Sequence, residues 1–289
     1  MIPRLPMASV FFLFIALLAG CSPRTIALRA MTSILDRGAQ AYYEEGDPVL
    51  AQEAMASQIK LLEALLKNDP GNPRLLTLSA EALGGYAFLF LEDAQPQRAK
   101  GIYLRARSAA SKILERDPAF KNFESMTLLE LESALRRADA QDVPGLFWAA
   151  YGWAGWINLS KDSPDALAGL PKAAAIMRRV QELSPGYCFG GPDLFLGTYY
   201  ASIPRMLGGD PIRSKEHFDA SLKATGGRFL IAKMLYAKHY AVAAQNEALF
   251  KAIVEDVLNS ADDFPQARLA NAVAKIKAGK LLERIHDLF

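Results

Sequence analysis

The amino-acid sequence predicts an all-α protein in which helical hairpins stack into one curved α-solenoid. Two observations lead to this prediction. Apolar residues recur at spacings of three and four, which places them on one face of a helix, and almost never alternate with the period of a strand. Proline and glycine interrupt the apolar segments at intervals that suit helix ends.

The apolar stripes and their boundaries locate about a dozen helices. Three stripes in the first half consist of Ile59, Leu62, Leu65 and Leu66, then Leu75, Leu78, Leu83, Tyr86 and Phe90, then Ile102, Ala106, Ala109, Ala110 and Ile113. Asp or Ser before Pro is typical of a helix start, because Pro fits the first turn and the preceding side chain caps it. Such boundaries lie at Asp69-Pro70, Asp117-Pro118, Ser163-Pro164, Ser184-Pro185 and Asp210-Pro211, with further breaks at Pro96, Pro144, Gly226-Gly227 and Pro265.

The boundary prolines indicate degenerate tetratricopeptide-like repeats. Pro118 and Pro185 are separated by about two units of the 34-residue repeat, whose pattern ends in proline. Ala106 and Ala173, twelve residues before each proline, are the small residues the repeat needs where two helices touch. Leu196-Gly197-x-x-Tyr200 matches the signature of the first repeat helix. Other boundary prolines are farther apart than one 34-residue repeat, so a non-repeating helical bundle remains the alternative.

The N-terminus predicts a lipoprotein signal peptide over residues 1–20. Arg4 precedes an apolar run from Ala8 to Leu18, and Leu18-Ala19-Gly20 leads directly into Cys21. We expect Cys21 to carry acyl chains that anchor residues 21–289, a short tether and one helical-repeat domain, to the periplasmic side of a Gram-negative envelope. Ser22 favours the outer membrane, and a plain secretory signal is the alternative.

Composition excludes several classes of protein. The formal net charge is only +2, and basic blocks with interleaved aromatic residues are missing, so we expect no nucleic-acid partner. After Cys21, no apolar run approaches the length of a membrane span. With Cys21 lipidated, Cys188 has no partner for an internal disulfide.

Chemistry-bearing residues are sparse. His217, His239 and His286 lack the three- or four-residue spacing of a helical metal site. The glycine pairs at 190–191 and 208–209 have neither the preceding strand nor the Gly-Lys pair of a phosphate-binding loop. A Cys188–His nucleophile pair stays open, although a thiol between two aromatic residues is more typical of a core. We expect no catalytic residue, metal or cofactor.

Aromatic residues provide the candidate binding site. Trp148 and Tyr151 lie in a cluster that covers more than one helix face, and Trp153 and Trp156 account for the core-facing stripe. A second apolar segment contributes Phe195, Tyr199 and Tyr200, and continues through Ile203, Met206 and Leu207. Asp193 either caps the start of that helix or contacts a ligand. We expect these aromatic residues to line a pocket for an apolar molecule. The alternative is that they pack in the core.

Most of the mature chain resembles a known family. The segments that carry the resemblance, in family order, are LLEALLKNDPGNPRLLTLSAEALGGYAFLFLE (61–92), IYLRARSAASKIL (102–114), VPGLFWAAYGWAGWINLS (143–160), LPKAAAIMRRVQEL (170–183), SKEHFDASL (214–222) and RLANAVAKIKAGKLLERIHDLF (268–289). They are similar to TatT, the tetratricopeptide-like T component associated with tripartite ATP-independent periplasmic (TRAP) transporters.

The resemblance implies a periplasm-facing lipoprotein that forms a homotrimer. It also implies docking of the transporter's periplasmic substrate-binding protein and a pocket or channel for hydrophobic ligands. One departure is that many relatives have Trp near the end of the first tail helix, where this chain has Lys280-Leu281-Leu282.

A repeat lipoprotein that assembles envelope proteins without binding a small ligand is the second hypothesis. An envelope hydrolase is the third, although no nucleophile–base motif supports it.

We predict that Cys21 is the only membrane anchor. Cys21→Ser removes the acylated thiol, so the variant should lose labelling by a fatty-acid analogue and leave the membrane fraction. Fractionation after a high-salt wash measures this. A serine variant that stays with the membranes would show a second anchor.

Overall fold

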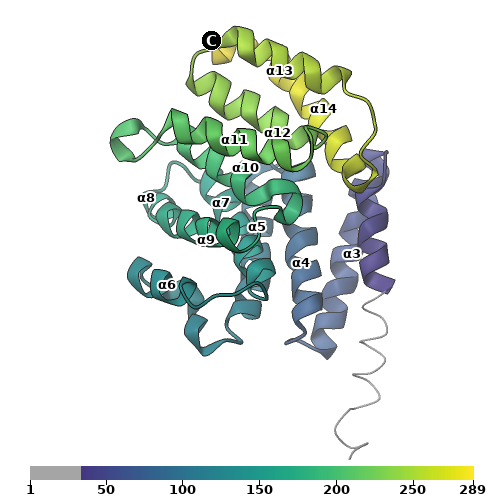
Figure 1. The fold of residues 1–289 in the computed structure, drawn as a ribbon. Coiled ribbons are helices and arrows are strands. Elements are labelled where there is room, and N and C mark those ends of the chain that lie inside the picture. Colours follow the sequence, from purple (N-terminus) through teal and green to yellow (C-terminus); the bar gives the residue numbers. More distant parts are fainter. Residues whose placement is uncertain (1–33) are drawn as a thin grey trace, which may run out of the picture. The chain divides into compact units, whose positions relative to one another are not determined.

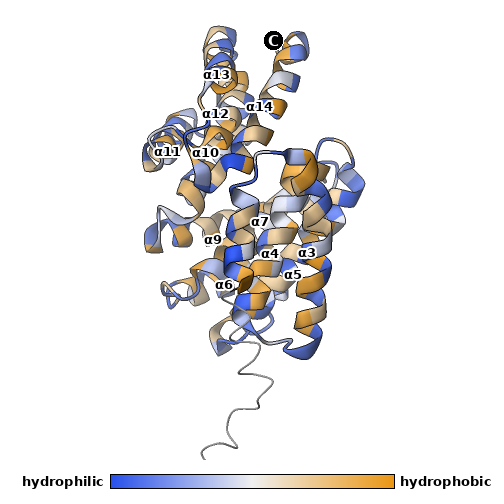
Figure 2. Ribbon diagram, turned by 90° about the vertical axis from the view of Figure 1, so that its right-hand side faces the viewer, coloured by the Kyte–Doolittle hydropathy of each residue, from blue (hydrophilic) through white to orange (hydrophobic). Residues whose placement is uncertain are grey.

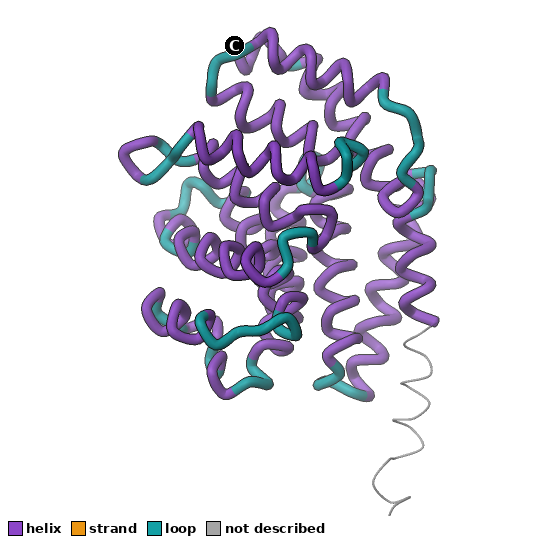
Figure 3. Tube along the Cα trace, in the orientation of Figure 1, coloured by secondary structure: helices purple, strands orange, loops and turns teal. Residues whose placement is uncertain are grey.

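The computed structural model describes residues 34–289, so Cys21 and the signal peptide lie outside the described residues. The chain forms two compact units, residues 1–40 and 41–289, of which the first is described only over residues 34–40, which are helical. Over residues 34–289 the secondary structure consists of helices and their connections, without a strand (Figure 3). The all-α prediction is confirmed.

The second unit is a succession of packed helices (Figure 1). Its first half contains α3 (Pro48–Asn68), α4 (Pro73–Tyr86), the π-helical η1 (Ala87–Leu91), α5 (Pro96–Leu114), η2 (Pro118–Phe120), η3 (Phe123–Ser125), α6 (Leu128–Leu135) and α7 (Val143–Asn158). Its second half contains α8 (Pro164–Leu167), α9 (Leu170–Leu183), α10 (Tyr187–Ser202), η4 (Arg205–Leu207), α11 (Pro211–Ala224), α12 (Leu230–Leu235), the π-helical η5 (Tyr236–Ala241), α13 (Glu247–Asn259), η6 (Pro265–Ala267), α14 (Arg268–Glu283) and α15 (Ile285–Leu288). Sequential neighbours pack in the pairs α4–α5, α5–α7, α7–α9, α9–α10 and α10–α11, as in a helical solenoid.

Three helices begin at the predicted Asp-Pro or Ser-Pro pairs, whereas at Asp69 and Ser184 the preceding helix ends and the next begins only at Pro73 and Tyr187. The side chains of Asp117, Ser163 and Asp210 accept hydrogen bonds from backbone N–H groups at the following helix starts, and each is followed by proline. Thr127 and Glu130 form a reciprocal capping box at the start of α6, which the sequence analysis did not identify.

Two hydrophobic cores bear on the candidate site, and further apolar residues are buried along α3 and α4. The first core lies among α4, α5, α6, α7 and α9, and the second lies among α10 to α14. Along the helices, hydrophobic residues alternate with hydrophilic ones, as expected when one face of each helix is buried (Figure 2). Ala106 and Ala173 are both fully buried, as the repeat pattern predicts.

Glycines bring α5 and α7 into close contact. A Cβ atom at Gly152 would lie 2.7 Å from the backbone oxygen of Tyr103 and 2.8 Å from the backbone nitrogen of Arg107. A Cβ atom at Gly155 would lie 2.5 Å from the Tyr103 ring. The two helices can therefore pack at this separation only because α7 has no side chain at these positions.

A left-handed turn interrupts α10 near its start. Cys188, Phe189 and Gly190 have φ values of 52°, 62° and 76°, and the helix continues from Gly191. Cys188 packs against the first core and Phe189 against the second. The glycines predicted to mark a turn do so, although two non-glycine residues share the left-handed conformation.

The apolar segment after Tyr200 differs from the prediction. The helix ends at Ser202, and Pro204 precedes the short η4, so Met206 and Leu207 do not continue the apolar face of α10. Their side chains are 90% and 72% exposed. They are therefore surface residues of the α10–α11 connection.

One described helical stretch, Pro73–Leu91, is long and apolar enough to cross a membrane, contrary to the prediction that no such run follows Cys21. It comprises α4 and η1, and 67% of its apolar window is buried. Burial of this extent is expected for a core helix of the solenoid.

We predict that Gly152→Ala destabilises the fold. The new methyl group would overlap backbone atoms of α5 that cannot rotate away, so the free energy of unfolding should fall by about 1–3 kcal/mol. Urea unfolding followed by circular dichroism measures it. Gly101→Ala in α5 is the control, because nothing lies within 4 Å of its Cβ position and alanine favours a helix. Equal stability of the two variants would contradict the close approach of α5 and α7.

Candidate functional site

Trp148 and Tyr151 project from one face of α7 toward α4. A Cβ atom at Gly84 of α4 would lie 3.1 Å from the Tyr151 ring and 3.3 Å from the Trp148 ring, so both rings cover this glycine. The two ring centroids are 5.2 Å apart, and Phe147 stacks on Tyr151 at 6.0 Å. Trp148 is a buried member of the first core, whereas Tyr151 at its edge retains accessible surface.

Phe195 and Tyr199 form a second pair of aromatic residues, on α10. They are one helical turn apart and stack with ring centroids 6.5 Å apart and an interplanar angle of 11°. Both are half-buried, and Phe195 packs against the first core. Trp148 is therefore buried in the first core, Tyr151 and Phe195 lie at its edge, and Tyr199 is half-buried beside Phe195.

Tyr200 and Asp193 lie on another face of α10. They are separated by two helical turns, and both are buried. Tyr200 stacks on His217 of α11 with centroids 5.6 Å apart, and the Arg213 guanidinium lies 4.2 Å from the Tyr200 ring centroid. The structure thus divides the predicted site residues between two environments.

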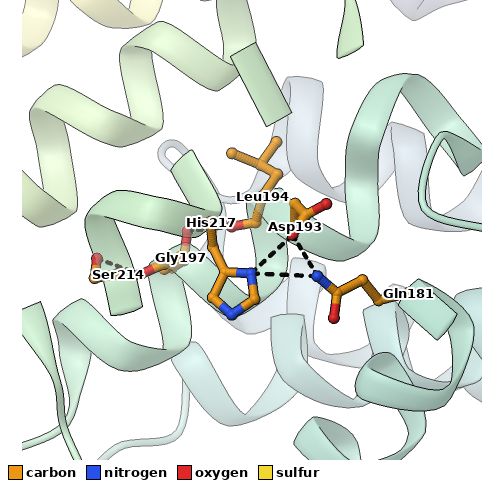
Figure 4. Close-up of polar contacts among 7 residues, drawn as sticks. Gln181, Asp193, Leu194, Gly197, Ser214 and His217 are labelled. Carbon is orange, nitrogen blue, oxygen red and sulfur yellow. Dashed lines mark hydrogen bonds and ion pairs between the residues drawn. The ribbon is translucent and has the colours of Figure 1, made fainter. Parts of the chain in front are cut away.

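Asp193 joins three consecutive helices (Figure 4). Its Oδ1 accepts a hydrogen bond from Gln181 Nε2 of α9 at 2.7 Å and lies 2.7 Å from His217 Nδ1 of α11. We expected a helix cap or a ligand contact, and the carboxylate instead bonds two side chains. A buried carboxylate needs such partners, because its desolvation is otherwise unfavourable. This cluster stabilises the packing of α9, α10 and α11.

Side chains near the left-handed turn are strongly desolvated. Burial raises the pKa of the Tyr151 hydroxyl well above its usual value, with smaller contributions from Glu92 and Cys188. Burial also raises the pKa of the Cys188 thiol, so the thiol is protonated at neutral pH. Both residues nevertheless retain accessible surface.

Polar residues gather where α7 ends, a feature that the sequence analysis missed. Glu92, just after η1, accepts hydrogen bonds from Tyr103 Oη at 2.6 Å and from Asn158 Nδ2 at 3.3 Å. Asp93 forms an ion pair with Lys277 of α14. These contacts join α5, α7 and α14, which are far apart in sequence, so periodicity within one helix could not reveal them.

Lys161, Lys238 and His239 lie beside this polar cluster. Burial lowers the pKa of Lys161, and the nearby charge of Lys238 lowers it further. Burial, then the charges of Lys238 and Lys161, lowers the pKa of His239 to about 3. Its imidazole is therefore neutral at physiological pH, and its Nδ1 lies 3.2 Å from Ser202 Oγ.

Two π-helical segments lie near these residues. Ala87–Leu91 continues α4 and leads directly into Glu92, and Tyr236–Ala241 continues α12 and contains Lys238 and His239. A π-helical turn shifts the following side chains around the helix axis and is frequent at functional sites. The sequence carries no period that marks either segment.

The cysteine and two of the histidines considered from the sequence have other contacts within residues 34–289. Within residues 34–289, no group of three or more His, Cys, Asp or Glu residues is placed to hold a metal ion. The Cys188 thiol is protonated, His217 contacts Asp193, and His239 contacts Ser202. The described part of the chain thus presents no Cys–His pair poised for nucleophilic attack.

Comparison with known proteins identifies the family. The family model described as TRAP transporter T-component matches residues 44–289, which include all the helices from α3 to α15. No curated protein matches the chain. The matched region covers most of the chain and contains every segment that suggested the resemblance. The chain belongs to the TRAP transporter T-component family, whose members are associated with TRAP transporters in the periplasmic envelope.

Proposed function

We propose that this T component is a Cys21-anchored lipoprotein of the outer membrane that binds the substrate-binding protein of its transporter. We further propose that it holds an apolar or amphipathic molecule in a pocket lined by Trp148, Tyr151, Phe195 and Tyr199. One observation carries the pocket hypothesis. Tyr151 of α7 and Tyr199 of α10 remain half-buried although the Phe147 and Phe195 rings stack on them, so each has apolar surface that packing within the chain does not cover.

The arrangement of the aromatic residues supports this pocket. Tyr151 and Tyr199 belong to different helices, and each remains half-buried although neighbouring rings stack on it. Leaving a large apolar side chain in contact with water forfeits about 1.5–3 kcal/mol relative to full burial. A bound apolar molecule would recover part of that energy, and the tyrosine hydroxyls can orient a polar end.

Tyr199→Ala should weaken the binding of N-phenyl-1-naphthylamine, a neutral fluorescent probe of apolar pockets. Loss of one aromatic contact, worth about 1–1.5 kcal/mol, corresponds to roughly tenfold weaker binding. Fluorescence titration gives the Kd, and circular dichroism checks that helicity is unchanged. Tyr42→Ala is the matched control, because Tyr42 is half-buried and bonds the backbone oxygen of Ala54 near α3.

Two outcomes would overturn the pocket hypothesis. The parent protein could fail to bind the probe, in which case the aromatic residues are core and the chain acts as a scaffold without a small ligand. Alternatively, the Tyr199 and Tyr42 variants could bind as tightly as the parent, and the aromatic surface of α10 would then play no part.

The exposed apolar residues of the α10–α11 connection support contacts with other protein chains. Met206 and Leu207, with Ile212 at the start of α11, are 90%, 72% and 73% exposed. Gly208 has a φ of 101°, and the Gly209 backbone N–H bonds Pro204 O at 3.1 Å, so the loop that presents these side chains is a defined turn. We assign this surface to the contacts between subunits of the proposed homotrimer.

We predict that residues 22–289 sediment as a trimer and that Met206→Glu with Leu207→Glu shifts the protein toward a monomer. Two carboxylates in an apolar contact would have to lose their hydration, which is strongly unfavourable. Analytical ultracentrifugation at micromolar concentration measures the change, with Leu129→Glu, a 75% exposed site on α6, as the control. The parent trimer should also co-sediment with the purified substrate-binding protein. A monomeric parent would refute the trimer, and independent sedimentation would refute the docking proposal.

A further inference from the structure

We propose that Trp153, Arg107 and Lys172, together with the first turn of α9, form a binding site for a phosphate group. These residues belong to α7, α5 and α9, which pack against one another in the pairs α5–α7 and α7–α9. Two positions along a helix differ by about 200° around its axis, so Trp153 lies on the opposite side of α7 from Tyr151. The site is therefore separate from the aromatic pocket proposed above.

Trp153 contributes a hydrogen-bond donor that the protein does not use. The residue is only 6% exposed, so its ring is held in the first core. Its indole N–H donates no hydrogen bond within residues 34–289, and unlike the N–H of Trp148 it is not sealed from solvent. A buried tryptophan usually has a partner for this group. A ligand oxygen would supply the partner.

The start of α9 lies directly against this N–H group. A Cβ atom at Gly169 would lie 2.5 Å from Trp153 Nε1, so only glycine allows so close an approach of the backbone. Gly169 is the N-cap of the 14-residue α9, which has no side-chain cap and no acidic residue in its first turn. The first N–H groups of a helix lack intrahelical partners and carry partial positive charge, which favours an anion.

Arg107 and Lys172 supply two positive charges around the same ring. The Cζ atom of Arg107 lies 3.9 Å from the Trp153 ring centroid, and the Nζ atom of Lys172 lies 5.8 Å from it. Both side chains are half-buried, and neither forms an ion pair with a residue in the described part of the chain. Arg107 Nε is sealed from solvent and has no hydrogen-bond partner there.

The nearest carboxylates do not neutralise these cations by contact. Burial lowers the pKa of Arg107, and the charge of Glu124 opposes this effect without cancelling it. Glu130 interacts electrostatically with Lys172, but its carboxylate accepts hydrogen bonds from Thr127 N at 2.7 Å and from Thr127 Oγ1 at 2.8 Å. Two desolvated like charges at one ring are unfavourable unless an anion joins them.

The donors fit a phosphate better than a carboxylate. A phosphate monoester carries a charge of about −1.5 to −2 at neutral pH, which the two cations would balance. A guanidinium that stacks on an aromatic ring can still donate two parallel hydrogen bonds from its edge, and an ammonium group is a compact phosphate ligand. The indole N–H and the start of α9 provide donors for the remaining oxygens. A carboxylate has only two oxygens and one charge, so it would leave part of this set unused.

The Trp153 N–H itself reports on binding. The chain contains three tryptophans, so the ¹⁵N–¹H spectrum has three indole signals, and Trp153→Phe assigns one of them. Inorganic phosphate in a HEPES buffer at pH 7.4 should move the Trp153 signal and leave the other two in place. The titration should show phosphate binding at least tenfold more tightly than acetate.

Charge removal at the site supplies the second measurement. Arg107→Met with Lys172→Met should weaken phosphate binding at least tenfold, because both charge-assisted contacts are lost. Lys112→Met with Arg116→Met is the control, since it removes the same charge from two exposed positions at the end of α5. Circular dichroism checks helicity. Lys172→Met alone, which leaves the Arg107 stack on Trp153 intact, should also weaken binding and replaces the double variant if that variant unfolds.

The outcomes decide for or against the site. An unmoved Trp153 signal in the parent, acetate binding as tight as phosphate binding, or unchanged phosphate affinity in Lys172→Met would each overturn it. Equal movement of all three indole signals would indicate a general salt effect and would overturn it as well. Phenyl phosphate and dihexanoylphosphatidic acid then distinguish a soluble phosphate ester from a lipid headgroup as the source, and tighter binding of either one supports the phosphate site.

Discussion

The left-handed turn at Cys188–Phe189–Gly190 is the constraint on which the rest of the structure depends. A non-glycine residue in this conformation costs about 1–2 kcal/mol, and two such residues occur in succession. Burial offsets that cost, because Cys188 packs against the first core while Phe189 packs on Phe229 and Phe264 of the second, at 5.0 and 5.5 Å. The turn therefore links the two cores and sets the direction of α10. A regular helix through these residues would rotate Asp193 and Phe195 away from their partners.

From this orientation, α10 presents two chemically different faces. One carries Asp193 and Tyr200 toward α11, where the buried Asp193 carboxylate contacts Gln181 and His217. The other carries Phe195 and Tyr199, whose rings stack on each other and remain partly accessible. The first face is fully explained by packing between helices. The second face is where packing leaves surplus apolar surface, and it is the face to which we assign the ligand.

The polar cluster at the end of α7 distinguishes this T component from a helical repeat that merely packs. Its carboxylates have partners, because Glu92 accepts hydrogen bonds from Tyr103 and Asn158 and Asp93 pairs with Lys277. Both π-helical segments supply residues to this cluster, Glu92 after the first and Lys238 and His239 within the second. The irregular backbone and the polar cluster therefore coincide.

Local physics made the fold predictable from the sequence. Apolar periodicity fixed the all-α class, and the Asp-Pro and Ser-Pro pairs located helix starts such as Pro118, Pro164 and Pro211, because capping and the fixed φ of proline act within a few residues. The aromatic candidates were also found locally, although periodicity placed Met206 and Leu207 on a helix that Pro204 prevents from continuing.

Only the tertiary structure decided which of those residues meet. Asp193 looked like a cap because it closely follows Gly191 at an expected helix start, and it became the link between Gln181 and His217 because the helices α9 and α11 both pack against α10. Lys161 and Lys238 gave no signal in the sequence. They are separated by 76 residues that contain five complete α-helices, α8 to α12, and their charges interact only after those helices pack. The sequence by itself determined the helices and where they begin, whereas long-range packing determined the site.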